Sequence, residues 1–354
     1  MKKRLTLAIT LILALTLVFT ACGSTSSPAS AAPAAPAAPA ASASPAAPPA
    51  PAKPAETAKY TMVTGSTGGT YYALGGAMAN TWNAHLNNIQ ISCVSSGASV
   101  ENMNLLQVGE ADLGISMNNV ADAAWNGNAP FTAKADNVRA IGVVYHEVYQ
   151  LIAASSTGAK TIADLKGKRV AIGPAGSGTA GTSEMVFRLS GLDVTKDITA
   201  ERDGFGDAAA KMQDGHLDAS AAVLSVPAAS IIEMTTSMDL NYIDIPDDIL
   251  EKIQAEAPFY TRLVIPAGTY SNKEPFNTIT CQAALYCRKD MTEDEVYEIT
   301  KAFYENAAEI AAAHTAGKDI SLEGALDGIT TPLHPGAVKY FKEKGLSIDA
   351  SLIV

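Results

Sequence analysis

Residues 65–82 read Gly-Ser-Thr-Gly-Gly-Thr-Tyr-Tyr-Ala-Leu-Gly-Gly-Ala-Met-Ala-Asn-Thr-Trp, and they decide much of the fold. They predict a glycine-rich turn between a short strand, 59–64, and an amphipathic helix. The glycines let backbone N–H groups point inward and the helix adds its positive dipole end, so the turn favours an anion. A second such turn, 173–179, follows a predicted strand at 169–172 and precedes a helix predicted from about 181 to 189. Two such turns indicate one anion held from both sides.

The chain beyond residue 60 alternates apolar strands with helices. The predicted elements are strands at 89–94, 111–117 and 218–224 and helices at 100–108, 121–125 and 207–213. Such alternation is typical of a parallel sheet in an α/β fold. Thr292-Glu293-Asp294-Glu295 is a capping box, which predicts that another helix begins there.

Two apolar segments, 138–154 and 278–288, are unusually long for single strands. Strands that cross between two domains have this length, so the sequence predicts two α/β lobes joined by two crossing strands. The first lobe is predicted to comprise 59–148 and 284–354, and the second 149–283.

The N-terminus has the layout of an export signal. Lys2, Lys3 and Arg4 precede an apolar run, 5–19, and small residues surround Cys22. This predicts a lipoprotein signal peptide over 1–21, with Cys22 lipidated after cleavage. A transmembrane anchor is the alternative, but the run is shorter than the roughly 20 residues that a bilayer crossing needs.

Residues 22–58 are predicted to form the lipidated Cys and a tether of Pro, Ala and Ser, which cannot build a core. The formal net charge of −11 becomes −14 when cleavage removes the three cationic residues before Cys22. A chain this acidic is not expected to bind nucleic acid.

Catalytic motifs are mostly absent. The five histidines form no His-x-x-x-His pair, so no metal site and no cofactor are expected. Residues 176–181 match Gly-x-Gly-x-x-Gly, but three residues separate the first glycine from the strand, and Thr179 stands where a P-loop has Lys. A secreted α/β enzyme that uses the glycine-rich loops for an anion or cofactor remains the alternative function.

Three cysteines remain beyond Cys22. Cys281 and Cys287 lie about 20 Å apart if they share one strand, so they cannot bridge each other. Pairing of Cys93 with either one stays open, and buried free thiols are favoured.

Five spaced motifs occur in the order seen in TAXI-type solute receptors of TRAP transporters, and the resemblance covers 60–345. The motifs are Gly65–Tyr72, Ser96–Ser99 with Glu101-Asn102, Asp164–Gly173 with Gly176–Thr179, Asp214–Ala219 and Pro332–Ala337. The resemblance implies a type II periplasmic-binding-protein fold that closes over a ligand and delivers it to an ion-driven permease. It also implies glutamate-like or 2-oxoglutarate-like carboxylates as ligands. Asn119 stands where the family commonly has Asp, and Ser225 where it commonly has Gly.

The expected ligand-binding residues lie on the loops that follow strands. Tyr71, rather than Tyr72, is expected to offer its hydroxyl, although a core tyrosine is the alternative, and a helix cap is the alternative for Ser99. Arg202 or Arg262 is expected at most to assist. The predicted site comprises Ser66, Thr67, Gly69, Thr70, Tyr71, Ser96, Ser99, Asn118, Asn119, Gly176, Ser177, Gly178, Thr179 and Ser225.

The sequence therefore predicts a lipid-anchored extracytoplasmic solute receptor. It is expected to act as a monomer and to serve a TRAP permease. Its expected ligand is a small carboxylate bound through neutral donors, a C4–C5 dicarboxylate or its amino, oxo or hydroxy derivative. A signalling or adhesion lipoprotein of the same fold is a further alternative.

Overall fold

The computed structural model describes residues 57–354. The predicted signal peptide, Cys22 and all but the last two residues of the tether lie outside the described residues. Within 57–354, no helix has the length and apolar character needed to cross a membrane.

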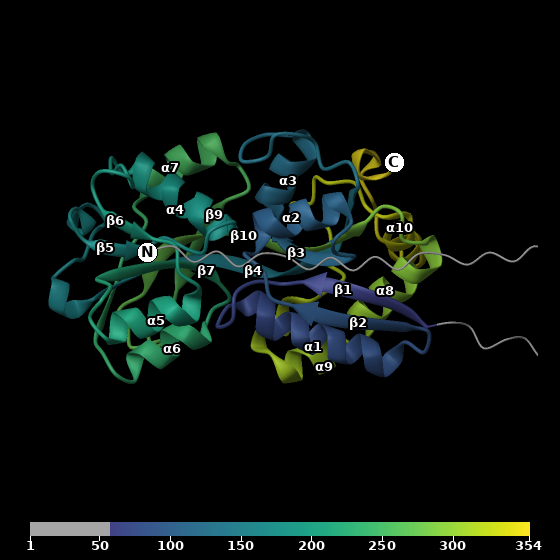
Figure 1. Cartoon of the computed structure of the whole chain (residues 1–354), viewed down its shortest axis with the longest axis horizontal. Coiled ribbons are helices and arrows are strands. Elements are labelled where there is room, and N and C mark those ends of the chain that lie inside the picture. Colours follow the sequence, from purple (N-terminus) through teal and green to yellow (C-terminus); the bar gives the residue numbers. More distant parts are fainter. Residues whose placement is uncertain (1–56) are drawn as a thin grey trace, which may run out of the picture. The chain divides into compact units, whose positions relative to one another are not determined.

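One mixed sheet of ten strands runs through the described chain (Figure 1). Its main order is β2-β1-β3-β10-β4-β7-β5-β6, with β8 beside β4 and β9 beside β10. The strands are β1 (Ala58–Val63), β2 (Ile89–Val94), β3 (Leu113–Met117), β4 (Val138–Ala154), β5 (Arg169–Ala171), β6 (Thr199–Glu201), β7 (Ala219–Leu224), β8 (Leu240–Tyr242), β9 (Thr261–Ile265) and β10 (Phe276–Arg288).

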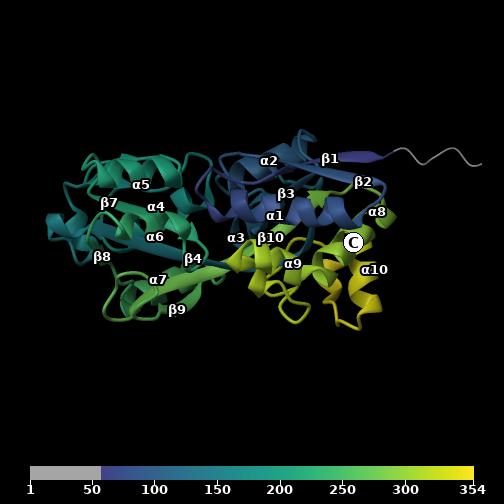
Figure 2. The ribbon, with the colours of Figure 1, turned by 90° about the horizontal axis from the view of Figure 1, so that it is seen from below.

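The long strands β4 and β10 pass from one half of the molecule to the other (Figure 2). The start of β10, 276–280, pairs with β9, whereas 283–287 pairs with β3. Likewise β4 pairs with β10 over 138–148 and with β7 over 148–153. The two halves of the sheet have matching strand orders when each is followed from its outer edge inward. The first half reads β2-β1-β3 and the second β6-β5-β7, and the crossing strands β10 and β4 lie between them. The predicted two-lobed α/β fold with two crossing strands is confirmed, while the exact lobe boundaries stay a prediction.

Helices cover both faces of the sheet in each lobe (Figure 1). In the first lobe α2 and α3 lie on one side and α1 and α9 on the other, and in the second lobe α4 and α7 lie opposite α5 and α6. The helices are α1 (Thr70–His85), α2 (Ser99–Val108), α3 (Asn118–Asn126), α4 (Gly178–Leu189), α5 (Phe205–Gln213), α6 (Ala229–Thr235), α7 (Asp247–Glu256), α8 (Glu293–Glu305), α9 (Ala307–Ala313) and α10 (Pro335–Glu343).

Local signals place most helix starts. The predicted capping box is present at α8, where the Thr292 side chain accepts from the Glu295 N–H and the Glu295 carboxylate accepts from the Thr292 N–H. Three predicted starts lie two or more residues late: α3 begins at Asn118 rather than 121, α4 at Gly178 rather than about 181, and α5 at Phe205 rather than 207. The α4 start is earlier because Ser177 serves as its N-cap.

Candidate functional site

The N-termini of α1 and α4, one from each lobe, end at the same narrow cavity. Its volume of about 20 Å³ accommodates about one water molecule. Its walls come from both lobes and from the crossing strand β4. They are formed by Gly65, Gly69, Thr70, Tyr71, Ala98, Ser99, Met117, Tyr145, Glu147, Ser177, Gly178, Thr179, Phe205, Val223 and Leu224.

The first helix presents its unpaired backbone end to this cavity. Gly69 is the N-cap of α1 and makes no side-chain cap hydrogen bond, and no acidic residue lies in the first turn. The first N–H groups of a helix have no partner within it, so Thr70 and Tyr71 begin a positively polarised end. The predicted glycine-rich turn therefore leads into a helix N-terminus that faces the cavity.

Helix α4 differs from α1, because the hydroxyl of its N-cap residue, Ser177, already makes hydrogen bonds within its own loop and helix. Ser177 Oγ donates to the Pro174 carbonyl at 2.7 Å and accepts from the Ala180 N–H at 3.1 Å. Thr179 Oγ1 accepts from the Val223 N–H at 3.4 Å. The expectation that Ser177 offers a free hydroxyl is therefore corrected: Ser177 is the N-cap of α4, and the donors that α4 presents are backbone N–H groups.

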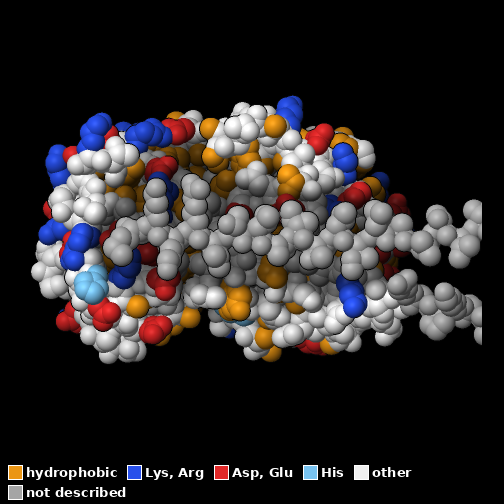
Figure 3. Space-filling model, in the orientation of Figure 1, with side chains coloured by type: hydrophobic (Ala, Val, Ile, Leu, Met, Phe, Trp, Pro, Cys, Tyr) orange, Lys and Arg blue, Asp and Glu red, His pale blue; other side chains and the backbone are white. Residues whose placement is uncertain are grey.

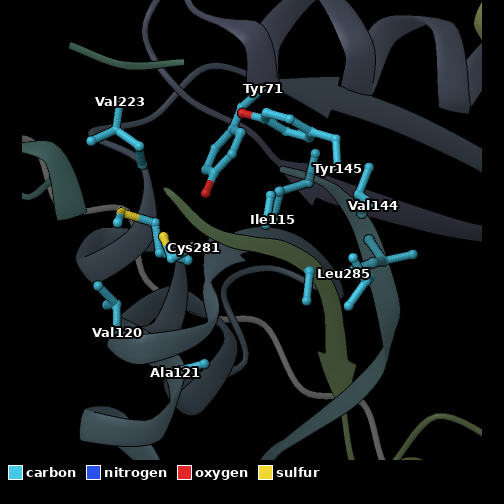
Figure 4. Close-up of a cluster of buried hydrophobic side chains, with 14 of the residues drawn as sticks. Tyr71, Ile115, Val120, Ala121, Val144, Tyr145, Val223, Cys281 and Leu285 are labelled. Atoms are coloured by element: carbon cyan, nitrogen blue, oxygen red, sulfur yellow. The ribbon is translucent and has the colours of Figure 1, made fainter. Parts of the chain in front are cut away.

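A carboxyl group, which the sequence did not predict, lies in the cavity wall. Glu147 of β4 is 2% exposed. One carboxylate oxygen accepts from the Tyr71 hydroxyl at 2.8 Å, and the other accepts from the Tyr145 hydroxyl at 3.1 Å. The two tyrosine rings meet edge to face with centroids 6.2 Å apart (Figure 4). Tyr71, chosen from the sequence over the exposed Tyr72, does place its hydroxyl at the cavity.

Burial dominates the ionisation of this cluster. It raises the pKa of Glu147 to about 8, against the opposing effect of the hydrogen bonds from Tyr71 and Tyr145. Burial also raises the pKa of both tyrosines, and the neighbouring Glu147 adds to that rise. At neutral pH the cluster is therefore mostly uncharged.

The two lobes touch directly around the cavity. Thr70 Oγ1 lies 3.1 Å from Ser225 Oγ and accepts from the Ser225 N–H at 3.0 Å. The backbone N–H groups of Val100 and Glu101, at the start of α2, donate to the Gly176 carbonyl of the opposite lobe at 3.0 and 3.2 Å. These contacts hold the two lobes together beside the cavity.

Close approach explains a glycine at this contact. A Cβ atom on Gly178 would overlap the sulfur of Met117, which belongs to the other lobe. Ala98, beside it in the cavity wall, has a φ of 74°, a conformation that non-glycine residues rarely adopt. Such strain persists where the surrounding structure holds it, and it is common at binding sites.

Several predicted site residues lie elsewhere. Ser96 Oγ donates to Asn102, and the Asn118 amide donates to the Gly328 carbonyl at 2.9 Å, so both serve loop structure. Thr67 is exposed, and Ser66 does not line the cavity, although its buried hydroxyl has no partner among the described residues. Ligand contacts by these residues stay a prediction, since a loop after a strand contains structural polar groups as well as ligand-facing ones.

Asn119 lies in a neighbouring outer groove of about 440 Å³ between α3 and α4, which Gly176 also lines. This groove shares Ser177 and Gly178 with the cavity. Its amide donates to the Tyr260 hydroxyl at 3.1 Å. Figure 3 shows hydrophobic side chains along the hollow between the lobes. Arg202 lines this groove but pairs with Glu184, and Arg262 pairs with Asp247, so neither arginine enters the cavity.

The cysteines and histidines do not build a reactive centre. Cys281 and Cys287 are buried and Cys93 is half-buried, and all three are free thiols. His146, on the crossing strand β4, is exposed and pairs with Asp319 at 3.2 Å. In residues 57–354 no three potential metal ligands cluster.

The sequence prediction missed Glu147 and Tyr145. One signal was available, because Glu147 is the lone carboxylate in the apolar segment 138–154. An acidic residue inside a buried strand is costly unless it has partners, so such a position is a candidate site residue. Its tyrosine partner on α1, 76 positions away, was not visible from the segment itself.

Known structures resemble the chain at low identity. The periplasmic aliphatic sulphonate binding protein SsuA from Escherichia coli is 16% identical, over 84% of this chain and 96% of that one, with a TM-score of 0.41. A binding protein component of an ABC phosphonate transporter from Pseudomonas aeruginosa is 10% identical, over 75% and 80%, with a TM-score of 0.48. Such distant likeness carries no inference about ligand or transporter.

The chain also matches a known protein family over most of its length. The profile of the NMT1-like family matches residues 62–345, which span both lobes and the cavity between them. The chain therefore belongs to the NMT1-like family.

Proposed function

We propose that this protein is an extracytoplasmic solute-binding protein that captures a small carboxylate between its lobes and delivers it to a membrane transporter. The observation that carries the proposal is the convergence of the α1 and α4 N-termini on one cavity. Helix N-termini bind anions through free N–H groups and the helix dipole. Two lobes on two crossing strands provide the hinge that capture and release require.

The chemistry of the wall favours a carboxylate group over a phosphonate group. Of the described residues that line the cavity, none is Lys or Arg, and Glu147 is acidic. A doubly charged phosphonate would meet no countercharge there, whereas one carboxylate matches the donors of the two helices. The enzyme alternative has less support, because no histidine lines the cavity to activate the hydroxyl groups of Thr70 or Ser99.

The partner is proposed to be a TRAP-type permease, and the ligand a C4–C5 dicarboxylate or its amino, oxo or hydroxy derivative. This part of the proposal rests on the order of the five sequence motifs that resemble TAXI-type receptors. Lipid anchoring through Cys22 and a monomeric state belong to the same proposal. Uptake that an ionophore abolishes, and that persists when ATP is depleted, would separate a TRAP permease from an ATP-driven one.

A thermal-shift panel tests the binding function. It should contain mono- and dicarboxylates, alkanesulfonates, phosphonates and uncharged sugars. At a hundred-fold excess over Kd the ligand should add about 2.7 kcal/mol of stability, which is a rise in Tm on the order of 5–10 °C. Stabilisation by sugars or cations without any by carboxylates would contradict the proposal.

A further inference from the structure

Glu147 retains hydrogen-bonding capacity toward the cavity. A carboxylate has about four acceptor positions, and the hydroxyls of Tyr71 and Tyr145 occupy one on each oxygen. Glu147 also lines the cavity, and its remaining acceptor positions can serve a ligand. Helix α1 contributes to the site in two ways. Its N-terminus faces the cavity, and the hydroxyl of Tyr71 in its first turn contacts Glu147.

The titratable groups around Glu147 supply no countercharge. They are Tyr71 on α1, Tyr145 on β4 itself, Cys281 and Tyr286 on β10, and Tyr260 in the loop before β9. All four tyrosines and the thiol are neutral at physiological pH, because burial raises the pKa of each. Within residues 57–354, then, the buried acid has only neutral partners.

We propose that Glu147 is a specificity-determining residue, which selects a ligand that carries a cationic nitrogen beside its acid group. The inference rests on the proposed function of the same site. The N-termini of α1 and α4 hold the acid group of the ligand, and the Glu147 carboxylate pairs with the ammonium group. Tyr71 and Tyr145 hold the carboxylate in place, since both donate to it.

The pairing changes the protonation of the protein. Before binding, the Glu147 carboxyl holds a proton at neutral pH, because burial raises its pKa to about 8. An ammonium group favours the charged form of a nearby carboxyl. On binding, the Glu147 O–H bond therefore breaks, its proton passes to the buffer, and the ligand nitrogen keeps all of its protons. A ligand with a hydroxyl group in place of the ammonium accepts a hydrogen bond from the protonated carboxyl and releases no proton.

Calorimetry with matched acids tests the proposal. The pairs are alanine and lactate, aspartate and malate, and glutamate and 2-hydroxyglutarate, each measured at pH 6.5 in two buffers of different ionisation enthalpy. The amino member of the binding pair should release about one proton and bind about ten-fold more tightly for each pH unit between 6 and 8. The hydroxy member should release none and should bind no better as the pH rises.

Two variants and one control identify the residue. Glu147→Gln should weaken the amino acid at least ten-fold and abolish proton release, while binding of the hydroxy acid is preserved. Tyr145→Phe, which removes one donor and keeps the acid, should move the pH midpoint of amino-acid binding upward. Glu298→Gln, on the exposed face of α8, should change neither the affinity for the amino acid nor the proton release.

The outcomes separate this inference from the proposed function. Two outcomes overturn the role of Glu147 without touching the proposed function. One is tighter binding of the hydroxy acid than of the amino acid. The other is amino-acid binding that releases no proton and that Glu147→Gln leaves intact. If no acid in the set or in the thermal-shift panel binds, the solute-binding proposal fails and this inference fails with it.

Discussion

The Thr70 hydroxyl of one lobe lies 3.1 Å from the Ser225 hydroxyl of the other. Both residues are buried, and the Ser225 N–H donates to the same Thr70 oxygen at 3.0 Å. This hydroxyl pair joins α1 to the loop after β7 beside the cavity. The lobes therefore hold each other through groups that the sequence predicts as ligand contacts.

Ser225→Ala should make the lobes separate more often. One buried hydrogen bond contributes about 1 kcal/mol, so the ratio of closed to open protein should fall about five-fold. Hydrogen exchange of the backbone amides around Thr70 and Val100 measures the opening. Ser230→Ala, in α6 of the same lobe, is the control, and equal exchange in the two variants would show that the hydroxyl pair does not hold the lobes together.

Gly178→Ala should hinder closure, because its Cβ would overlap Met117 across the cleft. Small-angle scattering at saturating ligand should give a larger radius of gyration than for the unmodified protein, and affinity should fall at least ten-fold. Gly181→Ala is a matched control on the same helix, since no atom lies within 4 Å of a Cβ there. That change should instead stabilise the protein by about 0.5–1 kcal/mol. Normal closure in Gly178→Ala would mean that the lobes approach differently.

Ser177→Ala should lower the free energy of unfolding by about 0.5–2 kcal/mol, because Ser177 caps α4. Chemical denaturation without ligand measures the loss. Ser190→Ala, at the other end of α4, should have less effect, since no described group bonds the Ser190 hydroxyl. A variant with normal stability but weakened ligand binding would instead support the direct ligand contact that the sequence predicts.

Glu147 should make stability fall as pH rises. Its folded-state pKa of about 8 lies above its usual value of 4.5, so between these values the folded state holds a proton that the unfolded state has lost. Stability should therefore decline by up to about 1.4 kcal/mol for each pH unit in that window. Denaturation of Glu147→Gln and the unmodified protein from pH 5 to 8 measures the difference. Parallel curves would mean that Glu147 ionises normally.

Cys22→Ser should release a folded protein from the membrane fraction, because the predicted lipid attaches to the Cys22 thiol. Fractionation and immunodetection of the two forms test this. Cys93→Ser, within the described fold, should leave membrane association unchanged. Equal retention of Cys22→Ser would count against lipidation at that residue.

The sequence by itself determined the features that depend on neighbouring residues. The glycine-rich turns, the capping box at Thr292 and the alternation of strands and helices are local, so they predicted the two lobes and both helix N-termini at the cleft. The length of 138–154 also predicted a crossing strand, because a strand of one domain seldom needs so many residues.

Only the tertiary structure decided which polar groups face the cavity. Glu147 meets Tyr71 across 76 positions, and Thr70 meets Ser225 across 155. Ser177 and Asn118, which the sequence assigned to the ligand, bond instead to nearby backbone or to Gly328. A hydroxyl or amide has the same local signature whether it caps a helix, joins two lobes or binds a ligand, and the choice depends on which distant groups the fold brings within hydrogen-bonding distance.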